Sequence, residues 1–230
     1  MGNIYIISDV HGCYKSLLAL IDKLPNKKKS KICFVGDLID RGRRSFEVMK
    51  FVMDNNYDLV LGNHEKMFLE YSPMLENDRK NDSLKHWLFN CGGEETLNSY
   101  SSKKEFFKQL DFLKSLPLYK EYKKYKTKDG RYLVVSHSAL GKAWELRNSK
   151  NKDDKNKFEA QVLWSRYKNY DNNKIFNVYG HTIFDEPVLN KYSCAIDLGC
   201  YKTHDKVKKP RLCALEFPSM KIFTQRNLEG

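Results

Sequence analysis

Five short segments of the sequence place aspartate, asparagine or histidine directly after an apolar run. These segments are Asp9-Val10-His11-Gly12, Gly36-Asp37-Leu38-Ile39-Asp40-Arg41-Gly42, Gly62-Asn63-His64-Glu65, Ser136-His137-Ser138 and Gly180-His181-Thr182. Carboxylate, imidazole and amide oxygen without thiolate suit Mn, Fe or Zn in a reactive centre better than a structural zinc site or an iron–sulfur cluster. The segments therefore predict a metal centre.

The ligands are too many for a single ion. One ion would be held by Asp9 and His11, a second by Asn63, His137 and His181, and the Asp37 carboxylate would bridge them. Two ions about 3.5–4 Å apart form the clamp used for in-line displacement at phosphorus. The ligand set thus indicates chemistry on phosphate esters.

Each segment taken alone also has an ordinary structural explanation. A histidine at a strand end is commonly a hydrogen-bonded structural residue, an aspartate there can cap a helix, and a glycine can simply make the turn. The same coincidence after five strands favours a shared site. Cys13, His86 and His204 lie outside this pattern, and we expect them to be bystanders.

The apolar runs that precede the first three segments have the pattern of strands in an α/β protein. Strands are expected at 4–7, 31–35 and 58–61, with helical periodicity between them. Uniformly apolar strands that alternate with helices indicate a parallel-type sheet covered on both faces. Ligands bind at the carboxyl ends of the strands in such a sheet, and the segments lie at those ends.

The remainder of the chain divides into a helical part and a strand-rich part. Residues 64 to about 116 have helical patterns, and 147–157 is polar enough to be a surface loop. Further strands are expected at 118–126, 132–136, 174–180, 193–199, 210–217 and 221–225. We therefore predict a single domain, 1–230, with a mainly helical insertion at about 65–117.

Composition limits the classes of protein that need to be considered. The 230 residues carry a formal net charge of +12, concentrated in lysine-rich stretches at 26–31, 123–128 and 201–211. These stretches are either solvated loops or a surface that attracts anionic substrates. They match no nucleic-acid-binding motif, so no stable nucleic-acid complex is expected.

The sequence shows no targeting or membrane signal. No apolar run approaches the ~18–20 residues of a membrane span, and the six cysteines include no C-x-x-C pair. We therefore expect a reduced, cytoplasmic protein without a membrane partner, and a monomer.

The order of the motifs resembles a known family. Asp9-x-His11-Gly12, Gly36-Asp37-x-x-Asp40-Arg41-Gly42 and Gly62-Asn63-His64-Glu65, followed by two later histidines, resemble the calcineurin-like metallophosphoesterases. Within these, the motifs resemble the phosphoprotein phosphatase family, which includes bacteriophage lambda-type serine/threonine protein phosphatases. The resemblance runs from Asp9 to about Gly199. It implies an α/β (α+β) fold, a four-layer β-sandwich of mixed sheets flanked by helices with a helical insertion, and two divalent metal ions, expected to be Mn with Fe, Zn or Ni as alternatives.

The resemblance also implies roles for the remaining site residues. A hydroxide held by the two metals would attack phosphorus, Asp40 would orient His64, and His64 would protonate the leaving oxygen. Arg41 and Arg166 would bind the phosphate with planar guanidinium groups, and Asn63 and His64 would also contact it. Arg166 is assigned from the segment 163–166, which resembles the one that supplies the family's second substrate arginine.

Two departures from the family pattern affect the edges of the site. His137-Ser138-Ala139 stands where the family usually has His-Ala-Gly, and the loop 201–211 lacks the glycine pair often seen there. The first departure keeps His137 but leaves the following turn open.

The substrate remains open between phosphoproteins and phosphorylated small molecules. The main expectation is a serine/threonine protein phosphatase, and the alternative is a symmetrical diadenosine tetraphosphate hydrolase, which shares these motifs. A nuclease of the same superfamily is a weaker alternative, because the Asp40-Arg41-Gly42 element is atypical of it.

Overall fold

The computed structural model describes residues 2–78, 80–166, 174–202 and 207–229, and it contains two five-stranded sheets. The first sheet has the order β10-β9-β1-β2-β3, with β1 (Ile4–Ile7), β2 (Lys31–Phe34), β3 (Asp58–Leu59), β9 (Arg211–Phe217) and β10 (Lys221–Arg226). The second has the order β4-β5-β6-β8-β7, with β4 (Tyr119–Lys126), β5 (Tyr132–Ser136), β6 (Ile175–Tyr179), β7 (Val188–Leu189) and β8 (Ser193–Ala195).

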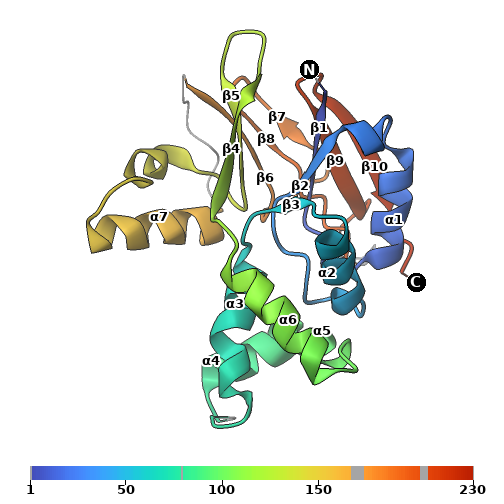
Figure 1. The fold of residues 1–230 in the computed structure, drawn as a ribbon, viewed down its shortest axis with the longest axis vertical. Helices are drawn as coiled ribbons and strands as arrows, with labels where there is room; N and C mark the ends of the chain where they lie inside the picture. The colour runs from blue at the N-terminus through green and yellow to red at the C-terminus, as the bar shows by residue number, and fades with distance from the viewer. Residues whose placement is uncertain (1, 79, 167–173, 203–206, 230) are drawn as a thin grey trace.

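Both sheets are mixed, and helices flank them (Figure 1). In the first sheet β1 pairs in parallel with β2 and antiparallel with β9. In the second sheet β5 pairs in parallel with β6 and antiparallel with β4. The predicted class, a β-sandwich of mixed sheets flanked by helices, is confirmed.

The alternation of side chains in β1 explains how the first sheet is covered. Ile4 and Ile6 belong to the apolar core between the sheets, whereas Tyr5 and Ile7 belong to the core beneath the helices, because successive strand residues point to opposite faces. All four are fully buried. The prediction that both faces of the first sheet are covered is correct. Helices cover one face, and the second sheet covers the other.

Helices cover the outer face of each sheet. Beside the first sheet lie α1 (Tyr14–Lys23) and α2 (Ser45–Asp54), and beside the second lies α7 (Lys152–Trp164) with a 3₁₀ segment, Gly141–Leu146 (Figure 1). Leu17, Leu20 and Ile21 of α1 are buried at helical spacing, as the sequence predicts. Burying such side chains contributes roughly 1.5–3 kcal/mol each.

A group of helices connects β3 to β4. These are α3 (Asn63–Tyr71), α4 (Asp82–Lys85), α5 (Gly93–Asn98) and α6 (Lys103–Lys114), with a 3₁₀ segment at Ser72–Leu75 and a π-helical turn at His86–Asn90. The π turn directly precedes Cys91-Gly92-Gly93. It places Trp87, which is fully buried, against the start of this helical group.

The prediction of a surface loop at 147–157 was wrong, because α7 begins at Lys152. The Asn151 side chain caps this helix by accepting hydrogen bonds from the backbone N–H groups of Asp153 (2.8 Å) and Asp154 (3.3 Å). Both carboxylates lie in the first turn, where the helix dipole favours them. Only one side of α7 is buried, and most of its residues are polar. The sequence of this helix therefore lacks a clear apolar periodicity.

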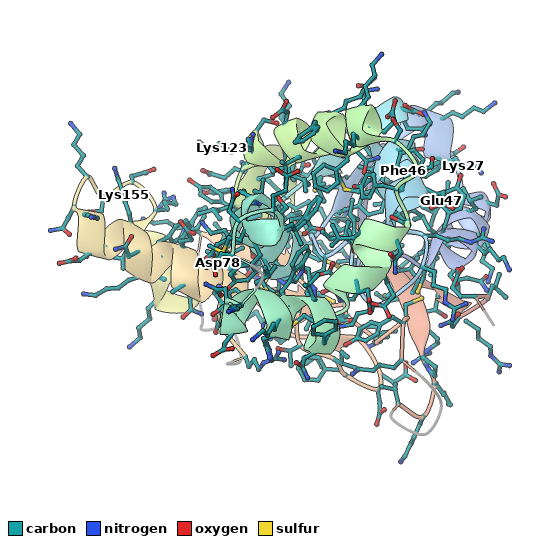
Figure 2. The ribbon with its side chains drawn as sticks, turned by 90° about the horizontal axis from the view of Figure 1, so that it is seen from below. Lys27, Phe46, Glu47, Asp78, Lys123 and Lys155 are labelled. Atoms are coloured by element: carbon teal, nitrogen blue, oxygen red, sulfur yellow. The ribbon has the colours of Figure 1, made fainter. Side chains whose placement is uncertain are left out.

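The excess of lysine is dispersed over the molecule. Figure 2 shows Lys27, Lys123 and Lys155 on different elements, with their side chains at the periphery. The loop 201–211 is described at 201–202 and 207–211, and His204 lies outside the described residues. Within the described part of the chain, no helix combines the length and the apolar character needed to cross a membrane.

Candidate metal centre

The loops that follow β1, β2, β3, β5 and β6 bring the six predicted metal ligands together at the carboxyl ends of these strands. Each of the six side chains is at most 8% exposed, namely Asp9, His11, Asp37, Asn63, His137 and His181. Five of the eight non-glycine residues with positive φ among those described belong to the predicted site: His11, Asp37, Asp40, Arg41 and His181. Such backbone strain gathers at functional sites.

One group of potential ligands consists of His11, Asp37 and His64, whose ligand atoms all lie within 4.8 Å of one another. His11 donates from Nδ1 to the carbonyl oxygen of Ile39 at 2.8 Å. Its Nε2 atom therefore carries the lone pair, and it lies 3.6 Å from Asp37 Oδ2. The hydrogen bond to the backbone thus fixes the tautomer that a metal ligand needs.

A second group consists of Asp37, His137 and His181. His137 donates from Nδ1 to the Val35 carbonyl oxygen at 3.0 Å, which leaves a lone pair on Nε2. That Nε2 atom lies 2.7 Å from Asn63 Oδ1 and 3.0 Å from His181 Nδ1. Asp37 belongs to both groups, as expected of a bridging ligand.

The chemistry of these atoms fits divalent cations. Asn63 Oδ1 and His137 Nε2 are both acceptors, so their 2.7 Å contact is repulsive unless a cation lies between them. Two ligand atoms at right angles around an ion, each about 2.1 Å from it, lie about 3 Å apart. The observed separations match this value.

The buried carboxylates at the centre give independent support. Burial raises the pKa of Asp9 and of Asp37 well above the ordinary value, and Asp197 adds to the increase in both. Like charges buried together are unfavourable unless positive charge compensates for them. Two cations would supply that charge.

The predicted pair of Asp40 and His64 is present. His64 donates from Nδ1 to Asp40 Oδ2 at 2.7 Å, and the same oxygen accepts from Trp87 Nε1 at 2.9 Å. Thr96 donates to the other carboxylate oxygen at 2.6 Å. Both partners are buried. The imidazole is therefore held with Nε2 toward Asp37, at 4.0 Å from its Oδ2.

Burial shifts the pKa of each partner in the direction that favours the neutral form of that group. It raises the pKa of Asp40 to about 7, although the bonds from Thr96 and Trp87 act in the opposite direction. It lowers the pKa of His64 to about 3, and the charges of Arg41 and Arg166 act in the same direction.

The charges of both predicted arginines act on His64 of this pair. Arg41 donates from its guanidinium to the carbonyl oxygen of Asn90, while its buried Nε has no hydrogen-bond partner among the described residues. Arg166 follows α7 and is exposed, and its positive charge helps to lower the pKa of both His64 and His181. The structure therefore brings both guanidinium groups to the centre.

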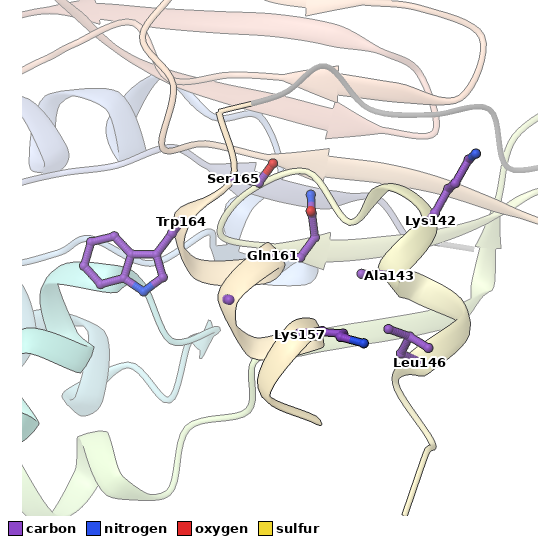
Figure 3. Close-up of a pocket in the computed structure, with 8 residues that line it drawn as sticks. Lys142, Ala143, Leu146, Lys157, Gln161, Trp164 and Ser165 are labelled. Carbon is purple, nitrogen blue, oxygen red and sulfur yellow. The ribbon is translucent and has the colours of Figure 1, made fainter. Parts of the chain in front are cut away.

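Ser138, where the chain departs from the family pattern, connects His137 to the helix that precedes Arg166. Its backbone N–H donates to Val162 at 2.8 Å and its hydroxyl to Gln161 at 2.6 Å, in both cases to the carbonyl oxygen. The turn that was left open is therefore tied to the end of α7. Figure 3 shows the adjacent cavity of about 590 Å³, which is lined by Gln161, Trp164 and Ser165 among others and by none of the predicted site residues.

Several buried groups in the site were not assigned from the sequence. Glu65 accepts hydrogen bonds from the backbone N–H groups of Asp37 (2.8 Å), Leu38 (2.7 Å) and Gly62 (3.0 Å), so one carboxylate fixes two ligand-bearing loops. Asp197, 3% exposed, completes the cluster of carboxylates. Glu65 could have been recognised as the third residue of α3, where a side chain can return to the helix start.

Of the residues expected to be bystanders, Cys13 and His86 belong to neither ligand group found among the described residues. Cys13 is buried, and a hydrogen bond with Cys200 together with burial raises the pKa of its thiol, so it is not an activated nucleophile. His86 is exposed at the start of the π turn.

Comparisons with known proteins agree with this geometry. A family model described as calcineurin-like phosphoesterase matches residues 2–210. The symmetrical bis(5'-nucleosyl)-tetraphosphatase of Coxiella burnetii (strain Dugway 5J108-111) is 32% identical over 151 residues, 64% of this chain and 45% of that protein. Its counterpart from Escherichia coli O1:K1 / APEC is 30% identical over 149 residues, 64% of this chain and 46% of that protein. The chain thus spans about half the length of the curated relatives it matches.

Solved structures share the fold over the whole chain. A crystal structure provisionally described as a diadenosine tetraphosphatase superposes with a TM-score of 0.67 at 19% identity, covering 100% of this chain and 95% of that one. A protein serine/threonine phosphatase from Saccharomyces cerevisiae superposes with a TM-score of 0.61 at 16% identity, covering 100% and 81%. At these identities the likeness concerns the fold alone.

Proposed function

This chain belongs to the calcineurin-like phosphoesterase family, and we propose that it is a dimetal hydrolase that cleaves dinucleoside tetraphosphates symmetrically. The observation that carries this choice of substrate is the name shared by the curated relatives, symmetrical bis(5'-nucleosyl)-tetraphosphatase. It favours the alternative expected from the sequence over the serine/threonine protein phosphatase that was the main expectation. Protein phosphatase activity is therefore the competing outcome of the test below.

We assign the metal ligands as the sequence predicts. Asp9 and His11 would hold one ion, Asn63, His137 and His181 the other, and Asp37 would bridge them. Two divalent cations bound there would supply the charge that activates a water molecule and polarises the phosphoryl oxygens. Mn is the expected metal, with Fe, Zn or Ni as alternatives.

Arg41 and Arg166 would bind the oxygens of the phosphoryl group under attack. A guanidinium group is planar and stays charged, so it can donate two parallel hydrogen bonds to a phosphate. The Nε of Arg41 is buried and has no hydrogen-bond partner among the described residues. Asn63 and His64 complete the contacts with the phosphate.

His64 would protonate the oxygen of the leaving nucleotide. Its Nδ1 is engaged by Asp40 at 2.7 Å, so Nε2 is the atom that faces the substrate. Trp87 and Thr96 in turn hold the Asp40 carboxylate. A proton donor fixed in this way contributes about 10²–10⁴-fold to rate.

We further propose that residues 1–230 form one phosphoesterase domain that acts as a monomer. Every residue assigned above comes from the same chain. The proposed metal ligands follow strands of both sheets. The mainly helical segment at about 65–117 would be an insertion, and it contributes Glu65, Trp87 and Thr96 to the surroundings of the site.

A pair of assays on one preparation tests the substrate. Metal-stripped protein reloaded with Mn²⁺ is given diadenosine tetraphosphate and a phosphoserine peptide at matched concentrations, and the two kcat/KM values are compared. We expect the ratio to favour the dinucleotide strongly. A ratio that favours the peptide would make the protein a protein phosphatase and overturn the proposed substrate.

A further inference from the structure

A second pocket, of about 600 Å³, adjoins the candidate metal centre. It lies between the loop that precedes α2 and the segment that follows β8. Six of its lining residues are Arg41, Arg43, Arg44, Tyr201, Lys202 and Glu229. It thus has four cationic side chains among its walls and one carboxylate.

This pocket shares a wall with the metal centre. The Tyr201 ring packs edge-on against His11, with ring centroids 4.5 Å apart. The guanidinium carbon of Arg41 lies over the same Tyr201 ring, 5.6 Å from its centroid. The side chains of Arg41 and Tyr201 therefore border both the pocket and the metal centre.

Two of the charges that line the pocket, those of Arg43 and Arg44, are available to an anion. Among the described residues, neither Arg43 nor Arg44 has an ion pair or a side-chain hydrogen bond. Glu229 is turned toward α1, where it accepts hydrogen bonds from the backbone N–H (3.0 Å) and hydroxyl (3.1 Å) of Ser16. Within the described part of the lining, the one carboxylate is thus already engaged, whereas the two arginines are not.

The number of cations distinguishes between substrate classes. A phosphoserine carries one phosphate, which Arg41 and Arg166 would bind, and nothing in such a substrate requires Arg43 and Arg44. A dinucleoside tetraphosphate carries three further phosphates next to the one under attack. Guanidinium groups match phosphate oxygens in shape and charge.

We propose that Arg43 and Arg44, with Lys202, form a polyphosphate subsite that binds the phosphates beyond the one under attack. This inference rests on the proposed function, because it makes these residues determinants of specificity for polyphosphate over monoester substrates. The two arginines directly follow the Asp40-Arg41-Gly42 turn, so the same loop would bind the reacting phosphate and its neighbours.

The test compares a double variant, Arg43→Gln/Arg44→Gln, with a control that loses the same charge, Lys103→Gln/Lys104→Gln at the exposed start of α6. The kcat/KM values for diadenosine tetraphosphate and for p-nitrophenyl phosphate are measured in both variants. We expect the arginine variant to lower the ratio of kcat/KM for diadenosine tetraphosphate to kcat/KM for p-nitrophenyl phosphate at least tenfold. The lysine variant should leave this ratio unchanged. An equal effect of the two variants on the ratio would overturn the subsite.

A second measurement separates failure of the subsite from failure of the proposed function. Inorganic tripolyphosphate is used to inhibit p-nitrophenyl phosphate hydrolysis at a fixed concentration of free Mn²⁺. We expect the inhibition constant to rise at least tenfold in Arg43→Gln/Arg44→Gln, even if the dinucleotide proves not to be a substrate. An unchanged inhibition constant would contradict the subsite whatever the substrate is.

Discussion

The Nδ1 atom of His64 lies 2.7 Å from Asp40 Oδ2, and the carboxylate that accepts this hydrogen bond is itself completely buried. The bond determines which ring nitrogen of His64 faces the metal centre. It also joins the loop after β2 to the start of α3. The geometry is that of an oriented proton donor.

Replacing His64 by asparagine should therefore reduce turnover while the metal ligands stay in place. We expect His64→Asn to lower kcat about 10²–10⁴-fold and to retain both Mn²⁺ ions. The loss should be larger for a phosphoserine peptide than for a dinucleotide, because an alkoxide needs the proton more than a phosphate does. Steady-state kinetics with metal analysis checks this. Unchanged turnover would remove His64 from the mechanism.

Gly180 should be essential for metal binding, because it lies against a predicted ligand. A Cβ atom at this position would lie 1.9 Å from Asp9 Oδ1. We expect Gly180→Ala to displace the Asp9 carboxylate and to weaken Mn²⁺ binding about 10–100-fold, as disturbing the surroundings of a ligand does. Calorimetric titration of the metal-free protein measures this affinity.

The matched control for Gly180→Ala is Gly130→Ala. Gly130 lies in the turn between β4 and β5 and has no atom within 4 Å of an added Cβ, although its φ of +89° makes the substitution strained. The control should therefore cost some stability without changing the affinity for Mn²⁺. Equal affinities in the two variants would show that Asp9 is not a ligand.

Ser138 should act as a positioning residue for Arg166. Its hydroxyl bond to the Gln161 carbonyl oxygen holds the end of α7, and losing such a bond costs about 0.5–1.5 kcal/mol. We expect Ser138→Ala to lower kcat/KM several-fold, and to have no further effect once Arg166→Ala is present. A double-mutant cycle measures this coupling. Additive effects of the two substitutions would contradict the role.

Asp58 should make a pH-dependent contribution to stability, because it links the two sheets. It accepts hydrogen bonds from Lys120 and from Tyr122 (2.7 Å), both on β4. Burial opposes ionisation of Asp58, but these bonds outweigh it and hold its pKa below the ordinary value. The ionised carboxylate therefore stabilises the fold above the unfolded-state pKa of ~3.9, and this contribution is lost as the pH falls further.

We expect Asp58→Asn to lower the free energy of unfolding at pH 7 by on the order of 1 kcal/mol, since the pair is partly exposed. The difference from the wild type should shrink as the pH falls below about 4, through the lowered pKa of Asp58. Urea denaturation at pH 7, 4 and 3 measures it, with the exposed Lys50–Asp54 pair tested by Asp54→Asn as the control. A difference that stays constant with pH would show that the charge of Asp58 is not responsible.

That the proposed metal ligands lie together could be predicted from the sequence, because each follows an apolar strand within a short local motif. The spacing of Asp37, Asp40 and Arg41 is set within one loop, so no long-range information was needed. The strands β1 and β2 and the helices α1 and α2 could also be predicted locally, because their apolar periodicity indicates which of their residues are buried.

The residues that support the site could not be predicted in this way. Thr96 and Trp87 reach Asp40 from the helices that connect β3 to β4, 56 and 47 residues away in the sequence. Asp197 influences the centre only because β8 pairs with β6. The helix α7 was missed for a different reason, since its stability depends on the Asn151 cap and on one buried side rather than on a clear apolar stripe.

The central claim, a dimetal centre that hydrolyses a phosphoanhydride symmetrically, is tested most directly by the products. Mn²⁺-loaded protein is incubated with diadenosine tetraphosphate in ¹⁸O-labelled water. The nucleotides are then separated, and their masses are determined by mass spectrometry. Direct attack of water predicts ADP as the only nucleotide, with one ¹⁸O atom for every two ADP molecules. AMP together with ATP, or no hydrolysis at all, would contradict it.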